Sequence, residues 1–275
     1  MLKMKKITYI FILAIVFTSC SDYQKVLNKG SVEEQYKLAT EMYDTGKYNK
    51  AIQLFEKITP AYRGKPQMER VQYMISDAYY NTKQYSLAAY YFDRFTKNYP
   101  RSTKKEDASY SSAYSYYLDS PIFSLDQAST KEALLAMQGF IDAYPNSDKI
   151  DDANKTIKEL RYKLEKKAFE TAKQYYHIDD YQAAITSFDI LISDYIGTSF
   201  KEQALFYKFM ASYELGKKSV QYKKEQRLKD AVKVYNRLKK SFSKSEYLED
   251  SEKLFKKLNE ELTTFEKEVE ITENK

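Results

Sequence analysis

The chain has 275 residues, with only 6 glycines and 5 prolines, and charged residues make up 31% of it. This composition favours an all-helical protein with well-solvated outer faces, and the length is enough to bury a continuous core. The net charge of +6 falls to +3 without the three lysines among the first six residues, a balance too weak to indicate a nucleic-acid partner.

The N-terminus reads as a targeting segment. Three lysines precede an apolar run of 11 residues, Ile7–Phe17. That run is shorter than the roughly 20 residues that span a bilayer, but it is typical of a secretory signal. FTSC, which ends at Cys20, resembles a bacterial lipoprotein cleavage box. The resemblance implies that residues 1–19 are removed and that Cys20, the only cysteine, is lipidated; the alternative is an ordinary signal peptide with an incidental cysteine.

Residues 20–31 are expected to form a short polar, lipidated tether before a series of helix pairs. The apolar periodicity predicts five pairs: Val32–Tyr43 with Lys47–Ile58, Val71–Asn81 with Ser86–Asn98, Asp107–Leu118 with Lys131–Ala143, Lys149–His177 with Tyr181–Asp194, and Lys201–Leu215 with Lys229–Phe242. A capping helix is predicted from Glu246, and residues 263–275 are expected to be a frayed acidic tail.

A small residue near the middle of each second helix is followed by a large apolar residue four and seven positions later. The pattern is clearest at Ala88, Phe92 and Phe95, and it recurs as Ala51/Phe55/Ile58, Ala133/Met137/Phe140, Ala184/Phe188/Leu191 and Ala231/Tyr235/Leu238. It resembles the second half of a tetratricopeptide (TPR) repeat. The expected fold is therefore all-α, a right-handed TPR α-solenoid of about five helix pairs with a C-terminal capping helix.

Two connections are longer than a TPR repeat requires. The link at 59–66 carries two prolines and is expected to be long and stiff. The segment 118–130 carries Ile122 and Phe123 and is a candidate contact surface, with the equally good alternative that it folds back over its own repeat.

The first helices carry aromatic pairs seven residues apart, nearly two helical turns, so the two rings of each pair share a face. In TPR proteins that face lines the concave groove. Tyrosine has an apolar body and a polar tip, so a row of them suits an extended peptide. The candidate peptide-binding residues are Tyr36, Tyr43, Tyr73, Tyr80, Tyr110, Tyr114 and Tyr117. The alternative is packing between repeats, especially for the corresponding Phe169 and Phe206.

A basic stretch, Lys217–Lys244, contains 11 basic residues and two acidic ones. It is a candidate docking surface for an acidic partner or anionic lipid, and the alternative is a solvated helix face. The candidate docking residues are Lys217, Lys218, Lys223, Lys224, Arg227 and Arg237.

The sequence contains little that supports catalysis. His177 is the only histidine and is expected to be exposed at a turn, and no glycine-rich phosphate loop, HExxH, CxxC or GxSxG motif is present. We therefore expect a non-enzymatic protein with no cofactor and no metal site.

Three segments in consecutive repeats, VQYMISDAYY, LAAYYFDRF and GFIDAYPNS, resemble the BamD family. That family is the lipoprotein subunit of the machinery that folds β-barrel proteins into the bacterial outer membrane. The resemblance implies a lipid-anchored protein in the outer membrane, facing the periplasm. Residues 32–148 would receive the C-terminal targeting segments of unfolded outer-membrane proteins. Residues 149–262 would dock the periplasmic domains of the BamA-type barrel subunit, with accessory lipoproteins as further partners.

The chain departs from the family pattern in the TPAYRGKP link, in DYIGTS at 194–199, and in its basic insertion and acidic tail. One alternative is another envelope TPR lipoprotein, an adaptor in cell-wall synthesis, gliding or secretion. A glycan-binding lipoprotein is a weaker alternative, because the chain has no tryptophan for a sugar platform.

Overall fold

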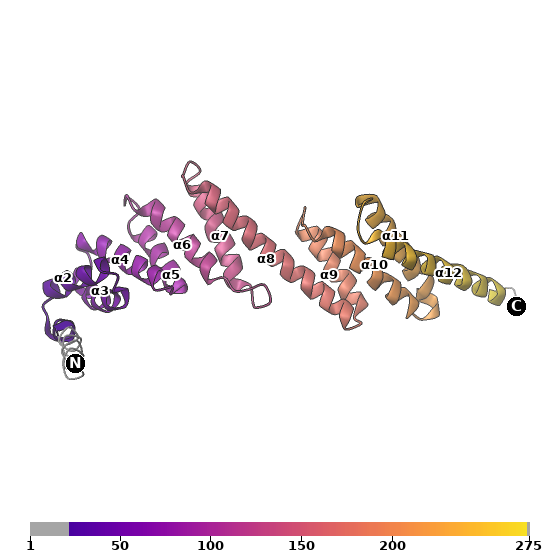
Figure 1. The fold of residues 1–275 in the computed structure, drawn as a ribbon, viewed down its shortest axis with the longest axis horizontal. Helices are drawn as coiled ribbons and strands as arrows, with labels where there is room; N and C mark the ends of the chain where they lie inside the picture. The colour runs from indigo at the N-terminus through magenta and orange to yellow at the C-terminus, as the bar shows by residue number, and fades with distance from the viewer. Residues whose placement is uncertain (1–21, 274–275) are drawn as a thin grey trace, which may run out of the picture. The chain divides into compact units, whose positions relative to one another are not determined.

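The computed structural model describes the backbone of residues 22–273 and the side chains of residues 22–265 and of Lys267. Within these residues every regular element is a helix (Figure 1). The predicted signal peptide and Cys20 lie outside the described residues. After a helix at 22–29, the helices are α2 (Val32–Asp44), α3 (Tyr48–Tyr62), α4 (Gln67–Asn81), α5 (Tyr85–Asn98), α6 (Lys105–Asp119), α7 (Ala128–Ala143), α8 (Ile150–His177), α9 (Tyr181–Asp194), α10 (Lys201–Lys217), α11 (Gln221–Ser241) and α12 (Leu248–Glu273).

The chain divides into two compact units, and the division falls inside α8. The N-terminal unit comprises Met1–Pro121 and Gln127–Leu160, and the C-terminal unit comprises Ile122–Asp126 and Arg161–Lys275. The predicted boundary at 148/149 precedes α8. The division lies further on because the first half of this 28-residue helix packs with α6 and α7, whereas its second half packs with α9.

Each unit is a stack of helix hairpins. In the N-terminal unit α2 packs on α3, α4 on α5 and α6 on α7, and successive hairpins meet through α3 with α4 and α5 with α6. In the C-terminal unit α9, α10 and α11 continue the series, and α12 packs on α11 and α10 as the predicted cap. This consecutive packing is that of a TPR-like solenoid.

The small-residue pattern forms the core of every hairpin, as predicted. The five alanines have no exposed surface: Ala51, Ala88, Ala133, Ala184 and Ala231. The large residues four positions later are all 3% exposed or less: Phe55, Phe92, Met137, Phe188 and Tyr235. A methyl side chain lets the two backbones approach, and the large residue fills the space one turn further on.

Several predicted boundaries are wrong, beginning with the link at 59–66. α3 continues through Pro60 to Tyr62, so only residues 63–66 connect it to α4. A proline in the last turn removes a single backbone bond. Tyr62 is buried against the ring of Tyr36, with centroids 5.4 Å apart, and this packing holds the final turn.

The segment predicted as a basic insertion, residues 216–227, is mostly helix. α11 begins at Gln221 rather than Lys229, since residues 221–227 are mostly good helix formers. Leu228 is fully buried, and a Cβ on Gly216 of α10 would lie 2.8 Å from its Cδ2. Glycine at that position therefore allows α11 to lie close against α10.

Both ends are more regular than expected. α12 continues to Glu273, past the point where fraying was predicted. Within the predicted tether, residues 22–29 are helical and Tyr23 is buried. α7 begins at Ala128, which shortens the inserted loop to residues 120–127.

Candidate functional site

The aromatic pairs on the first helices, called the ladder below, pack partly within their own hairpins. The N-terminal residue of each pair is its first position and the C-terminal residue its second. First-position rings touch the second helix of the hairpin: Tyr73 lies 5.8 Å and 5.3 Å from the rings of Phe92 and Phe95, and Tyr110 lies 5.2 Å from Phe140. Tyr36 packs on Tyr62, as described above. All seven candidate tyrosines are half-buried, so each keeps part of its surface accessible.

Three of the five second positions are packed by the tyrosine that opens the following helix, whereas α7 and α11 open with Ala128 and Gln221. The pairs are Tyr43 with Tyr48 at 5.6 Å, Tyr80 with Tyr85 at 5.8 Å and Tyr176 with Tyr181 at 5.9 Å. Edge-to-face and tilted contacts of this kind are favourable for aromatic rings. The sequence contained a signal for these pairs, because the opening tyrosine always lies three residues before the buried alanine.

Two of the second-position hydroxyls bridge neighbouring repeats. Tyr43 donates to Asp77 of α4, and Tyr117 donates to Glu159 of α8, both at 2.5 Å. Burial and the bond to Asp77 raise the pKa of Tyr43 well above its usual range. The bond to Glu159, together with burial, raises the pKa of Tyr117 to about 12. Packing between repeats, the alternative reading of the ladder, therefore accounts for part of what these two residues do.

Tyr80, Tyr110 and Tyr114 form the middle of the ladder. Tyr110 stacks on Tyr114 at 5.7 Å, and Tyr114 lies 5.4 Å from Tyr117. Tyr114 of α6 also acts electrostatically on Tyr80 of α4, and Tyr80 acts on Tyr110, which places the rings of these two helices near one another. Rings from α4 and α6 are thus neighbours in the N-terminal unit.

Four connectors, those that follow α5, α7, α9 and α11, share a geometry that sequence reasoning missed; the 63–66 connector has no serine or threonine. In these four, a serine or threonine hydroxyl accepts from the backbone N–H two residues later; the caps are Ser102 on Lys104, Ser147 on Lys149, Thr198 on Phe200 and Ser245 on Tyr247. This cap directs the later residue over the first ladder ring of the preceding repeat. A common spacing, five residues after Tyr99, Tyr144, Tyr195 and Phe242, was the available signal.

The covering residue differs between the two units. In the N-terminal unit it is a cation: the Lys104 ammonium lies 5.7 Å from the centre of the Tyr73 ring, and that of Lys149 lies 6.0 Å from the centre of the Tyr110 ring. In the C-terminal unit aromatic rings cover the ladder, with Phe200 stacked 5.1 Å from Phe169 and Tyr247 stacked 4.7 Å from Phe206. Cationic rims suit an anionic or aromatic ligand, whereas stacked rings close the surface.

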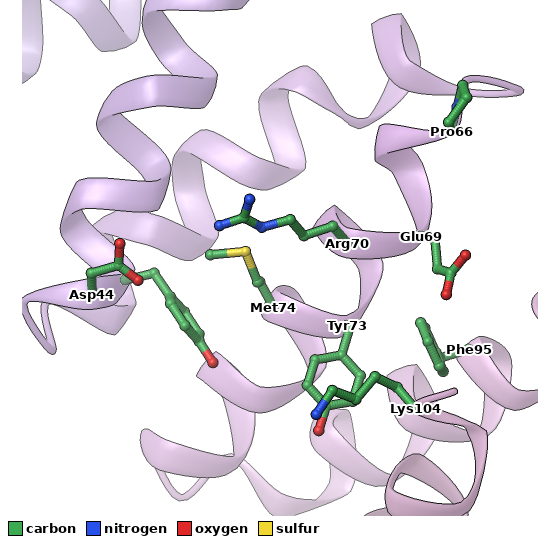
Figure 2. A pocket seen from close by; sticks show the side chains of 9 residues that line it. Asp44, Pro66, Glu69, Arg70, Tyr73, Met74, Phe95 and Lys104 are labelled. Atoms are coloured by element: carbon green, nitrogen blue, oxygen red, sulfur yellow. The ribbon is translucent and has the colours of Figure 1, made fainter. Parts of the chain in front are cut away.

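A pocket of about 450 Å³ opens on the ladder of the N-terminal unit between α2 and α4 (Figure 2). Its lining residues are Tyr43, Asp44, Pro66, Glu69, Arg70, Tyr73, Met74, Phe95 and Lys104. In Figure 2 Lys104 extends across Tyr73, while Arg70 and Met74 point from α4 toward the side that carries Asp44. The pocket combines aromatic walls with two exposed cations, Arg70 and Lys104, and two carboxylates. Of the predicted ladder, only Tyr43 and Tyr73 line it.

A second pocket of about 260 Å³ lies on the other side of α4. Its α4 residues are Met68, Gln72 and Ile75, which at about 100° per residue face away from those of the first pocket. Arg94 of α5 is on its rim, 5.5 Å from the centre of the Tyr90 ring.

The predicted docking residues do not share one surface. Lys218 contacts Asp179, Glu214 and the Tyr181 hydroxyl, and Lys217 lies over Tyr213. Lys224 faces α12, where it pairs with Glu261 at 2.9 Å. Lys223, Arg227 and Arg237 lie on one side of α11 by helical spacing, and Arg227 donates to the Ser219 hydroxyl at 2.7 Å.

The inserted loop of the third repeat is held against α8. The Lys166 ammonium lies 4.4 Å from the centre of the Phe123 ring, and Lys167 donates to backbone carbonyls at Ser124 and Leu125. Ile122 is exposed on the same loop. Phe123 therefore packs on the first helix of the fourth pair and not on its own repeat, which was the alternative prediction for this loop.

Among the described residues, no group of three or more His, Cys, Asp or Glu side chains is arranged to hold a metal ion. His177 is exposed at the end of α8, as expected. Within the residues that the structure describes, no helix is both long and apolar enough to cross a membrane.

Comparisons with known proteins give one informative result. No curated protein matches the chain. A chain from "Computational Design of Self-Assembling Cyclic Protein Homooligomers" matches 98% of this chain over 99% of its own length, at 16% identity and a TM-score of 0.22, which is too low to carry an argument. The model of the family YfiO, described as "Outer membrane lipoprotein", matches residues 28–228, well over half of the sequence. The chain therefore belongs to the YfiO family of outer-membrane lipoproteins, the BamD family of the β-barrel assembly machinery.

Proposed function

We propose that the N-terminal unit binds the C-terminal targeting segments of unfolded outer-membrane proteins along its tyrosine ladder. The family is a generally non-enzymatic one, so the work is binding and orientation rather than chemistry. The observation that carries the proposal is the pocket of about 450 Å³ between α2 and α4, where Tyr43 and Tyr73 meet the cations Arg70 and Lys104. The last residue of the segment enters this pocket, and the preceding residues extend along the ladder.

The chemistry of the two partners is complementary. Aromatic side chains of a barrel segment pack on the half-buried tyrosine rings, which offer contact area at a small cost in side-chain entropy. The terminal carboxylate meets Lys104 and Arg70 through charge-assisted hydrogen bonds. Because rings and point charges place few demands on side-chain identity, the ladder accepts many related segments.

The C-terminal unit, in this proposal, docks the periplasmic domains of the BamA-type subunit. Lys223, Arg227 and Arg237 on one side of α11 supply the basic contact, and accessory lipoproteins are further partners. Lys217, Lys218 and Lys224 have contacts within the unit and act mainly there. Lipid on Cys20 holds the protein in the outer membrane, facing the periplasm.

The test is a peptide-binding measurement with a variant that removes both pocket cations, R70Q/K104Q. We expect its affinity for a C-terminal peptide of an outer-membrane β-barrel protein to fall about tenfold, which corresponds to about 1.4 kcal/mol of lost charge-assisted contact. Fluorescence anisotropy with a labelled peptide measures it. The matched control is R94Q/K97Q, which removes an exposed arginine and lysine of α5 that do not line this pocket.

A peptide amide provides the second arm of the test. Replacing the terminal carboxylate by a carboxamide should weaken binding to the unmodified protein and have little further effect on R70Q/K104Q, because both changes remove the same contact. Equal affinities of the unmodified protein for acid and amide, or equal losses in the two double variants, would reject the pocket as the binding site.

A further inference from the structure

The helix at residues 22–29 is docked on the first hairpin through Tyr23. This ring is 6% exposed, and the Lys50 ammonium lies 4.9 Å from its centre. Its hydroxyl lies 3.1 Å from the Lys50 carbonyl oxygen and 2.9 Å from Gln53 Oε1, both on α3. A buried tyrosine with satisfied hydroxyl contacts is an anchoring residue, not part of a loose linker.

The other end of this helix is held as firmly. Gln35 Nε2 of α2 donates to the carbonyls of Val26 and Leu27, at 3.1 Å and 3.0 Å, and the Lys57 ammonium of α3 also donates to the Leu27 carbonyl. The Leu27 carbonyl belongs to the last turn, where a helix lacks partners of its own for such groups. The Val26 carbonyl also accepts from the Gly30 N–H, at 2.9 Å. Two helices of the hairpin therefore cap the preceding one.

The joint between residues 22–29 and α2 is tightly packed. A Cβ at Gly30 would lie 2.6 Å from the Val26 carbonyl oxygen, so a larger residue would displace the last turn of the helix. Ser31 and Glu34 then cap α2 reciprocally, Ser31 through its hydroxyl and Glu34 through its carboxylate. The direction of the helix relative to the hairpin is thereby set.

The anchor lies a short distance along the chain. Three residue steps separate Cys20 from Tyr23, and such a stretch spans at most about 11 Å in any conformation. A lipid on Cys20 consequently keeps the docked end of the helix within that distance of the membrane.

We propose that residues 22–29 form a rigid arm that holds the first hairpin against the phospholipid headgroup layer. The proposal rests on the lipidation of Cys20 stated under the proposed function. The exposed residues of the arm are all polar: Asp22, Gln24, Lys25, Asn28 and Lys29. Two lysines against one aspartate leave this surface with a net positive charge, which suits contact with lipid phosphates rather than insertion into hydrocarbon. The N-terminal end of the solenoid thus lies at the membrane surface and is not suspended from it.

The test measures the height of the hairpin above a bilayer. Because Cys20 is the only natural cysteine and is consumed by lipid, a cysteine at exposed Lys37 accepts a single donor dye. The full lipoprotein is reconstituted in phosphatidylethanolamine–phosphatidylglycerol vesicles that contain an acceptor-labelled lipid. We expect strong energy transfer in the parent protein, and a loss of transfer in Y23A/Q35A and when a Gly-Ser spacer is inserted between Ser21 and Asp22.

The spacer variant keeps every contact of the arm, so it reports on height even if Y23A/Q35A loosens the fold. Exposed Glu41, changed to alanine, is the control and should leave transfer unchanged. If the parent and the spacer variant give the same transfer, or if Y23A/Q35A matches the parent, the arm does not set the height. Absence of an acyl mass on Cys20 by mass spectrometry would instead remove the anchor, and the arm proposal with it.

Discussion

Tyrosine has two roles in this protein at the scale of the single residue. The inner part of each ladder ring packs within its hairpin, as with Tyr73 on Phe95, and the outer part is left accessible. Where the hydroxyl reaches the next repeat, as from Tyr117 to Glu159, it adds a hydrogen bond between repeats. An amphipathic ring can do both at once, because its apolar body and polar tip point to different surroundings.

The Tyr117–Glu159 bond predicts a difference in alkaline stability. The folded-state pKa of Tyr117 is raised to about 12, against 10.0 for the free side chain. The protonated tyrosine is the form that the fold favours, so its contribution is complete below pH 10.0 and is lost as the pH rises to about 12. We expect Y117F to lose less stability than the parent protein across this window.

Urea unfolding at several pH values, followed by far-ultraviolet circular dichroism, measures that difference. At neutral pH the Y117F substitution should cost less than about 1 kcal/mol, because the bond is open to solvent. Parallel pH profiles for the two proteins would mean that the bond does not persist in solution.

At the scale of the element, the first turns of α11, predicted from the sequence as an insertion, contact α12. The Lys224–Glu261 pair, with side chains 23% and 24% exposed, joins the N-terminal turns of α11 to α12. Burial and Glu261 also raise the pKa of Tyr213 on α10. Leu258 and Phe265 of α12 are buried in the same region. The basic insertion and the capping helix, which look like separate additions in the sequence, are therefore joined by this contact.

Charge reversal tests this contact. K224E and E261K should each lower the free energy of unfolding of the C-terminal unit by about 1 kcal/mol, and the double variant should recover most of the loss. The comparison pair is Lys253–Glu249, which is 63% and 81% exposed, and its reversal should have almost no effect. If the double variant loses as much unfolding free energy as the sum of the two single losses, the two side chains are not coupled.

At the scale of the whole molecule, the two units carry different surfaces. The N-terminal unit has a ladder rimmed by Lys104 and Lys149, whereas rings of Phe200 and Tyr247 cover the corresponding positions of the C-terminal unit. This contrast favours peptide binding by the first unit and docking by the second, since only the first leaves cations over its ladder.

A division of labour predicts separable defects. K223E/R227E/R237E should weaken docking to the periplasmic domains of the BamA-type subunit, more strongly at low than at high salt, and leave peptide affinity unchanged. R70Q/K104Q should show the converse. Biolayer interferometry with immobilised periplasmic domains, beside the peptide assay, measures both quantities. A variant that lowers both affinities together would contradict the assignment of one role to each unit.

Sequence reasoning recovers the local part of this fold. The buried alanines, the large residues after them and the bounds of α8 and α9 follow from apolar spacing, because a helix hairpin is packed by residues close together in the chain. The ladder tyrosines follow from the same spacing. The cations of the pocket do not, because Arg70 and Lys104 carry no periodic apolar signal.

By itself, then, the sequence determined the helical repeat and the buried residues at the centre of each hairpin. The tertiary structure alone decided which groups meet across repeats: Tyr43 with Asp77, Lys224 with Glu261, and Tyr23 with α3. The physical reason is that contacts within a hairpin depend on helical period, whereas contacts between hairpins depend on how connectors and extensions stack them. The composition of residues 22–29 does not distinguish a polar tether from a docked helix. Only the position of α3, against which Tyr23 buries its ring, decides between them.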